Sequence, residues 1–112
     1  MRLESRKLLE DIRHAVCEIQ RFVGDAAFEA YAASSLIRSA VERQFEIIGE
    51  ALSRLVKLDP KTAAEVGDFR RIISFRNILA HAYDAVDHRI VWGIIRNDLP
   101  RLLGQVQILL AR

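Results

Sequence analysis

Apolar residues recur at helical spacing along almost the whole chain, and few residues interrupt them. Only five glycines and two prolines occur among 112 residues, which suits a few long helices better than many turns. The spacing predicts four main helices, over residues 2–23, about 34–58, 68–84 and from 88 onward. Pro100 lacks the N–H that a helix interior needs, so we expect a kink near residues 97–100. The predicted fold is all-α, an antiparallel up-down bundle in a single domain over residues 1–112.

The predicted ends of these helices coincide with residues that cap or break helices. They are Gly24 after the first helix, Ser34 or Ser35 before the second, Asp59 and Pro60 after it, and Asp68 and Asp87 before the third and fourth. Between the second and third helices, residues 60–67 are expected to form a loop with one helical turn.

Composition narrows the class of protein. Apolar residues make up 51% and charged residues 29%, as in a globular chain, and no apolar run reaches the length of a membrane span. The start of the chain has no signal-peptide core, and the single Cys17 cannot form an internal disulfide, so we expect a reduced, cytoplasmic setting. Cys17 is expected to be a small core residue. A net charge of +2 permits a nucleic-acid partner without requiring one.

The centre of the second predicted helix contains an unusual glycine. Gly49 in a helix interior costs up to about 1 kcal/mol relative to alanine. Such a glycine predicts the close approach of another helix or backbone. Glu46 and Glu50 flank it as a like-charged pair, which is either solvated or paired with a cation such as Arg43 or Arg76.

The third predicted helix has two distinct faces. At 100° per residue, its apolar face comprises Ile72, Phe75, Ile78, Leu79 and Ala82. The opposite face comprises Arg76, Asn77, His81, Tyr83 and Asp84, with the small Ala80 between them leaving room for side chains to converge. This face offers a guanidinium fork for phosphate, an amide, a titratable imidazole and a phenol. For an arginine and a histidine alone, a solvated helix face would be the simpler interpretation.

Three blocks of the sequence resemble one known family. The octet RNILAHAY at residues 76–83 matches the R-x-x-x-x-H-x-Y signature of HepT-type proteins in the HEPN superfamily. AVERQFEIIGEAL at residues 40–52 is similar to the second-helix block of that family, and VDHRIVWGIIRNDLP at residues 86–100 to its final-helix block. One departure is Phe69, where relatives often carry tryptophan, and it bears on packing more than on chemistry.

The resemblance implies a fold, an activity and a partner. HepT-type proteins are homodimeric HEPN bundles and metal-independent endoribonucleases that act as toxins in type VII-like toxin–antitoxin pairs. Carried over, Arg76, His81 and Asn77 would be catalytic residues in a cleft at the dimer interface, with RNA as substrate and without cofactor or metal. The antitoxin would be a MntA-type minimal nucleotidyltransferase that transfers AMP from ATP to Tyr83, which we expect to be solvent-accessible. Assembly of dimers into larger particles stays open.

The chemistry of the patch agrees with these expectations. Cleavage of RNA without metal needs a base, an acid and positive charge at the phosphate. One chain supplies a single histidine in the patch, so a two-fold dimer that pairs two His81 and two Arg76 side chains is expected. AMP on Tyr83 would bring a phosphate anion toward Arg76. Two alternatives remain, a non-catalytic nucleotide- or antitoxin-binding HEPN dimer and a structural helical oligomer.

Overall fold

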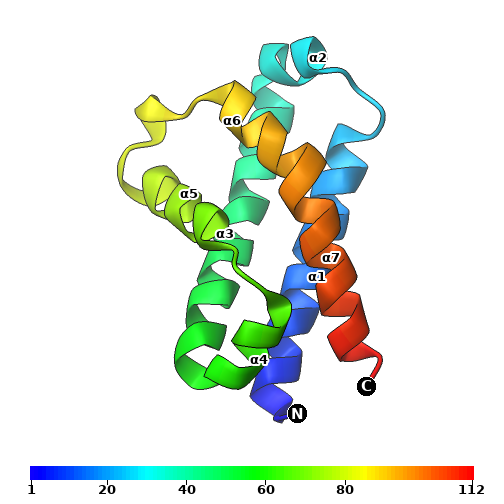
Figure 1. Ribbon diagram of the computed structural model, residues 1–112. Helices are drawn as coiled ribbons and strands as arrows, with labels where there is room; N and C mark the ends of the chain where they lie inside the picture. Colours follow the sequence, from blue (N-terminus) through cyan, green and yellow to red (C-terminus); the bar gives the residue numbers. More distant parts are fainter.

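The computed structural model describes all 112 residues except for the side chain of Tyr83. Throughout the described chain the regular elements are helical, and no strand is present, which confirms the all-α class (Figure 1). Three helices form its body: α1 (Leu3–Val23), α3 (Ser35–Leu58) and α7 (Leu99–Leu110). The helix α1 packs against both α3 and α7. Four further helices complete the fold in the described chain: α2 (Phe28–Ala33), α4 (Pro60–Val66), α5 (Arg70–His81) and α6 (His88–Gly93).

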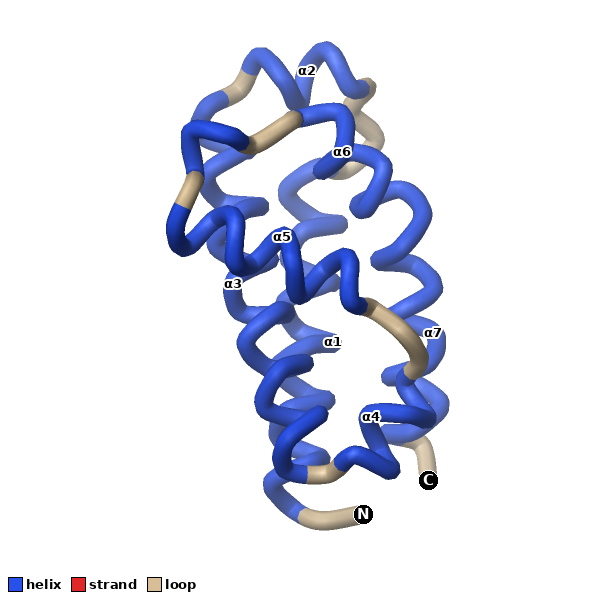
Figure 2. Tube along the Cα trace, turned by 60° about the vertical axis from the view of Figure 1, so that its left-hand side comes forward, coloured by secondary structure: helices blue, strands red, loops and turns tan.

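The helices alternate in direction, as predicted for an up-down bundle. Both termini lie at one end of the molecule, from which α1 runs away and toward which α3 and α7 return (Figure 1). The helix α5 runs outward again and crosses α3 at an inclination, which is clearest in Figure 2. No helix in the described structure is both long enough and apolar enough to cross a membrane.

The helix α1 buries one stripe of its surface between α3 and α7. Leu9, Ile12, Val16 and Ile19 are fully buried at helical spacing. Cys17, which we expected in the core, is exposed. It follows Val16 by a single position, and the 100° turn between them points it toward solvent.

The connection from α1 to α3 uses the predicted caps. Gly24 ends α1 with a φ of 56°, a conformation that favours glycine. The Ser34 hydroxyl accepts a hydrogen bond from the Ile37 N–H at 3.1 Å and so caps α3. Between them, α2 buries Tyr31 against Trp92, with ring centroids 5.4 Å apart.

The segment after α3 is more regular than expected. Residues 60–66 form the helix α4, with Pro60 at its first position, where a missing N–H has little cost. Asp59 caps this helix by accepting a hydrogen bond from the Thr62 N–H at 3.2 Å. It also accepts a 2.6 Å bond from the buried Ser5 hydroxyl of α1. The hydrogen bonds from Ser5 and Thr62 lower the pKa of Asp59 to about 2.

The last helix changes its hydrogen-bond pattern just before Pro100. The change lies close to the predicted kink, but it is a π-helical turn. Figure 1 shows one continuous helical ribbon from α6 to α7. Residues 94–98 within it form a π-helical turn, closed by a hydrogen bond from the Leu99 N–H to the Ile94 carbonyl. Because this turn already departs from the regular α-helical ladder, the helix accommodates a proline without a break.

Candidate functional site

Buried apolar side chains hold α5 against α3. Ile72, Phe75 and Leu79 are buried, and the Phe75 ring meets the Phe45 ring edge-on with centroids 5.1 Å apart. Ile78, which the helical wheel placed on the apolar face, is 41% exposed and lies at the edge of the contact. These contacts fix the position of α5 on α3, and with it the position of the residues on the other faces of α5.

The predicted close approach at Gly49 is made by α5 of the same chain. A Cβ atom at Gly49 would lie 2.3 Å from the Cβ and 2.7 Å from the Cγ of Arg76. Non-bonded carbons pack at about 3.5–4.0 Å, so no larger residue fits there without moving α5. The side chain of Arg76 therefore starts against the backbone of α3.

The guanidinium of Arg76 ends beside the carboxylate of Glu50. Its Nη2 donates to Glu50 Oε2 at 2.8 Å, and the other oxygen of Glu50 accepts from Arg54 Nε at 2.9 Å. Glu46 pairs with Arg43 at 3.3 Å. Each of the two like-charged glutamates of α3 is thus paired with arginine. Of the two interpretations given above, pairing with a cation is confirmed.

The structure brings Asn77 to Arg76, and helical spacing puts Asn77 between Arg76 and His81 around α5. Arg76 Nη1 donates to Asn77 Oδ1 at 3.3 Å. His81 is exposed and is the last residue of α5. Helical geometry puts its Cα about 7.5 Å along the axis from that of Arg76 and about 140° around it. A single chain therefore presents the guanidinium and the imidazole on different sides of one helix.

The chain leaves the α5 helix before it reaches Tyr83. Ala82 has φ −146° and ψ 48°, and residues 83–85 form a separate 3-10 turn. The prediction of one helix through Asp84 is therefore wrong, and the helical wheel does not place Tyr83 beside Arg76. The predicted accessibility of Tyr83 concerns a side chain that lies outside the described residues.

A groove of about 300 Å³ opens beside Arg76. Side chains from α1, α3 and α5 line it, among them Arg43, Glu50, Arg54, Arg76 and Ala80. Ala80 lines this groove, so its small side chain leaves space there, as predicted. Three arginines and three carboxylates line the groove, and each of the arginines is paired with a glutamate. An anion such as a phosphate would compete with these glutamates for the guanidinium groups.

The chain matches the family described as "Ribonuclease HepT-like" over residues 12–109. The chain belongs to the HepT-like ribonuclease family. The matched region of this HepT-like chain includes α3, α5, most of the residues that line the groove, and the signature residues Arg76, Asn77 and His81.

Curated relatives resemble this HepT-like chain over nearly their whole length. A protein from Thermococcus cleftensis named "Probable ribonuclease HepT" is 34% identical over 107 residues, which cover 96% of each chain. A protein from Methanocaldococcus jannaschii, named as a proposed RNase, is 31% identical over 103 residues, or 92% of this chain and 94% of the relative. A similarly named protein from Caldanaerobacter subterraneus is 34% identical over 98 residues, or 86% of each chain. No solved structure matches significantly.

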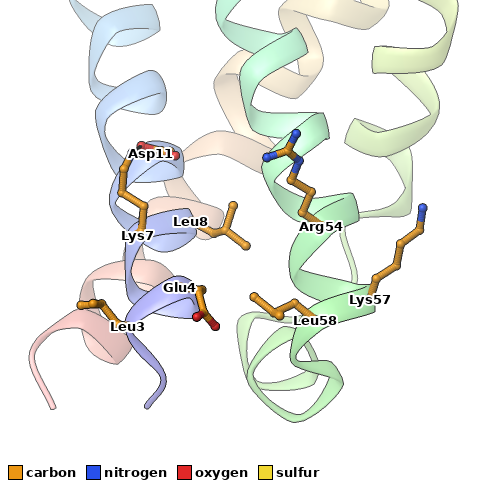
Figure 3. A pocket seen from close by; sticks show the side chains of 8 residues that line it. All are labelled: Leu3, Glu4, Lys7, Leu8, Asp11, Arg54, Lys57 and Leu58. Atoms are coloured by element: carbon orange, nitrogen blue, oxygen red, sulfur yellow. Dashed lines mark hydrogen bonds and ion pairs between the residues drawn. The ribbon is translucent and has the colours of Figure 1, made fainter.

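A second, larger groove adjoins the first. It has a volume of about 990 Å³ and lies between the start of α1 and the end of α3. Figure 3 shows Leu8 and Leu58 pointing toward one another across it, whereas Lys57 points away. Leu8, Asp11 and Arg54 line both grooves. The larger groove contains none of the signature residues.

Sequence reasoning missed Arg54 as part of the site. Arg54 follows Glu50 by four residues on α3, a spacing that favours pairing of opposite charges on a helix. Only the crossing of α5 over Gly49 shows that this ordinary pair is joined to the signature arginine. Among the described residues, no cluster of three or more His, Cys, Asp or Glu side chains is placed to hold a metal ion.

Proposed function

We propose that this HepT-like chain is a metal-independent endoribonuclease that acts as the toxin of a toxin–antitoxin pair. The observation that carries the proposal is the presence of a half-buried Arg76, an exposed Asn77 and an exposed His81 on a firmly packed α5. The names of the relatives support RNA as the substrate.

The proposed reaction uses the 2′-hydroxyl of the RNA as nucleophile. A base removes its proton, the 2′-oxygen attacks phosphorus, and the bond to the 5′-oxygen breaks as an acid protonates that oxygen. The products are a 2′,3′-cyclic phosphate and a 5′-hydroxyl. His81 is the proposed proton-transfer residue, because an imidazole can both accept and donate a proton. Arg76 would neutralise the phosphorane, and Asn77 would orient the groups.

The proposed active unit is a homodimer. One chain offers one histidine on α5, whereas the reaction needs a base and an acid together. A two-fold axis near α5 would place a second His81 and a second Arg76 in the same cleft. The separation of Arg76 and His81 around α5 supports this arrangement, because Arg76 of one subunit would then meet His81 of the other.

The proposed control of the toxin is adenylylation of Tyr83. The phenol oxygen would attack the α-phosphorus of ATP, pyrophosphate would leave, and AMP would remain on the tyrosine. The enzyme for this transfer would be a MntA-type nucleotidyltransferase, as the family resemblance implies. The attached AMP would then obstruct RNA in the cleft by its bulk and its negative charge.

A binding module without catalysis is the second candidate. The contact that favours it is the pairing of Arg76 with Glu50, which already occupies part of the phosphate fork. Incubation of the purified protein with RNA in excess chelator separates the two functions. Fragments with cyclic-phosphate ends, absent from a His81→Ala preparation, support the nuclease. Intact RNA retained by the protein would support the binding module.

A further inference from the structure

We propose that Glu50 is a positioning residue for Arg76, and that Gly49 and Glu50 together set how the guanidinium meets an RNA phosphate. The contact between these residues stands independently of any activity. Its consequence for catalysis rests on the nuclease function proposed above.

The first step of the argument is steric. The 2.3 Å that would separate a Cβ at Gly49 from the Cβ of Arg76 leaves room for a hydrogen only. The first atoms of the Arg76 side chain are therefore pressed against the backbone of α3. From that starting point, the next residue of α3, Glu50, lies within reach of the guanidinium.

The second step concerns the carboxylate of Glu50. Its two oxygens accept from two different arginines, at 2.8 Å from Arg76 and 2.9 Å from Arg54. A carboxylate fixed by Arg54 on one oxygen is a better-defined partner for Arg76 than a freely rotating one. Arg54 thus helps to hold Glu50 in the position that orients Arg76.

The third step counts the donors of Arg76. A guanidinium carries five N–H groups. One on Nη2 is given to Glu50 and one on Nη1 to Asn77, so both terminal nitrogens are tethered. Three N–H groups remain for phosphate oxygens. Because both ends are held, the direction of those three is set before RNA arrives, which lowers the entropic cost of binding in the reactive geometry.

The charges predict an unusual combination of kinetic effects. Arg54, Glu50 and Arg76 together carry a net charge of +1, and neutralising Glu50 would raise it to +2. RNA should therefore bind as well or better to a Glu50→Gln protein, because phosphate contacts depend on positive charge. Turnover should nevertheless fall, because Arg76 would no longer be oriented. A purely structural defect would not produce this divergence between KM and kcat.

The kinetic test compares Glu50→Gln with Glu18→Gln. Glu18 lies on α1 and also pairs with an arginine, Arg21, at 2.6 Å, so both variants lose one paired negative charge. Glu50→Gln should lower kcat roughly 10- to 100-fold, as expected for a misplaced catalytic group, with KM unchanged or lower. Glu18→Gln should stay within about twofold of wild type, as expected for a surface ion pair. An unchanged or increased kcat in Glu50→Gln would overturn the proposal.

A second measurement does not depend on activity. In ¹⁵N NMR spectra, the Nη signals of a tethered guanidinium are separate, because rotation about the Cζ–Nη bonds is slow. Those of Arg76, identified by their loss in Arg76→Lys, should be separate in wild type and averaged in Glu50→Gln. Identical Arg76 signals in the two proteins would contradict the positioning role. If the signals change as expected but wild type leaves RNA intact, Glu50 does orient Arg76 and the proposed nuclease function is wrong.

Discussion

Arg76 and His81 share one short helix but are held in different ways. The side chain of Arg76 starts against α3 and ends in hydrogen bonds to Glu50 and Asn77. His81 is exposed at the end of α5, where its imidazole is open to solvent. Such a contrast suits a residue that fixes a phosphate and another that exchanges protons with its substrate.

The first prediction concerns these two residues. His81→Ala and Arg76→Ala should each abolish cleavage of RNA and toxicity in cells, because one removes the proton transfer and the other the positive charge at phosphorus. Asn77→Ala should weaken cleavage less. Circular dichroism should show an intact fold for all three, since none of these side chains belongs to the core. Cleavage by His81→Ala at the wild-type rate would exclude His81 as the acid or base.

The second prediction concerns Tyr83. Tyr83→Phe should keep the fold and most of the RNA cleavage, yet remain toxic when the antitoxin is co-expressed, because the AMP acceptor is missing. Intact-mass and peptide mass spectrometry after co-expression should find AMP on the Tyr83 peptide of wild type and none in the variant. Tyr31 is the internal comparison, because it is fully buried. AMP mapped to Tyr31 instead would refute the assignment.

At the scale of elements, core stripes and most caps were predictable, and helix ends without caps were not. Ser34 and Asp87 cap their helices as expected, because each offers a side-chain oxygen to N–H groups of the first turn. The prediction that Asp68 is the N-cap of the third helix is wrong: Phe69 holds that position in α5, and Asp68 accepts a hydrogen bond from the Arg70 N–H from one residue before it. The end of α5 at His81 has neither glycine nor proline nearby. Its position follows from the turn that the chain makes toward α6, which periodicity alone does not reveal. The helical-wheel prediction therefore extended the third helix through Asp84.

The same distinction applies to the candidate site. Gly49 and the paired glutamates signalled a contact, because each is unfavourable on an isolated helix. Arg76 is the residue that both packs against Gly49 and pairs with Glu50. The sequence predicted it only as one of several possible partners. Cys17 was misplaced because one residue beside an apolar stripe is already turned by 100°.

The third prediction concerns the junction of α3, α4 and α1 at Asp59. Its pKa is lowered from 3.8 to about 2 by bonds from Ser5 and Thr62. A lowered folded-state pKa means that this stabilisation is present above pH 3.8 and is lost as the pH falls toward 2. Asp59→Asn should therefore lower the melting temperature at pH 7 and flatten its decline over that acidic range. Thermal unfolding followed by circular dichroism at several pH values measures both effects.

Asp25→Asn provides the control for this experiment. Asp25 is an exposed residue in the connection before α2. Its replacement should leave the acidic decline of the melting temperature as in wild type. A decline of equal steepness in Asp59→Asn and wild type would show that Asp59 is not the group responsible.

At the scale of the whole molecule, no contact in the described structure argues for a dimer, because the close approach at Gly49 is made by α5 of the same chain. What remains is the chemistry, since the described surface of α5 carries one histidine and the reaction needs two proton-transfer groups.

The fourth prediction is that the protein is a dimer in solution. Light scattering coupled to size-exclusion chromatography should give twice the chain mass of 12.8 kDa at micromolar concentration. Mixed dimers with one His81→Ala subunit should then show whether one or two imidazoles are required. A monomer that still cleaves RNA at that concentration would contradict the two-chain site.

The shared position of the two termini has a practical consequence. Both chain ends emerge at the end of the bundle that lies opposite the connection between α5 and α6 (Figure 1). A fluorescent protein or an immobilisation tag fused to either end would therefore lie at the opposite end of the bundle from the end of α5, where His81 is. The protein is therefore suited to surface-tethered, single-molecule observation of RNA cutting, with the anchor chosen at either end.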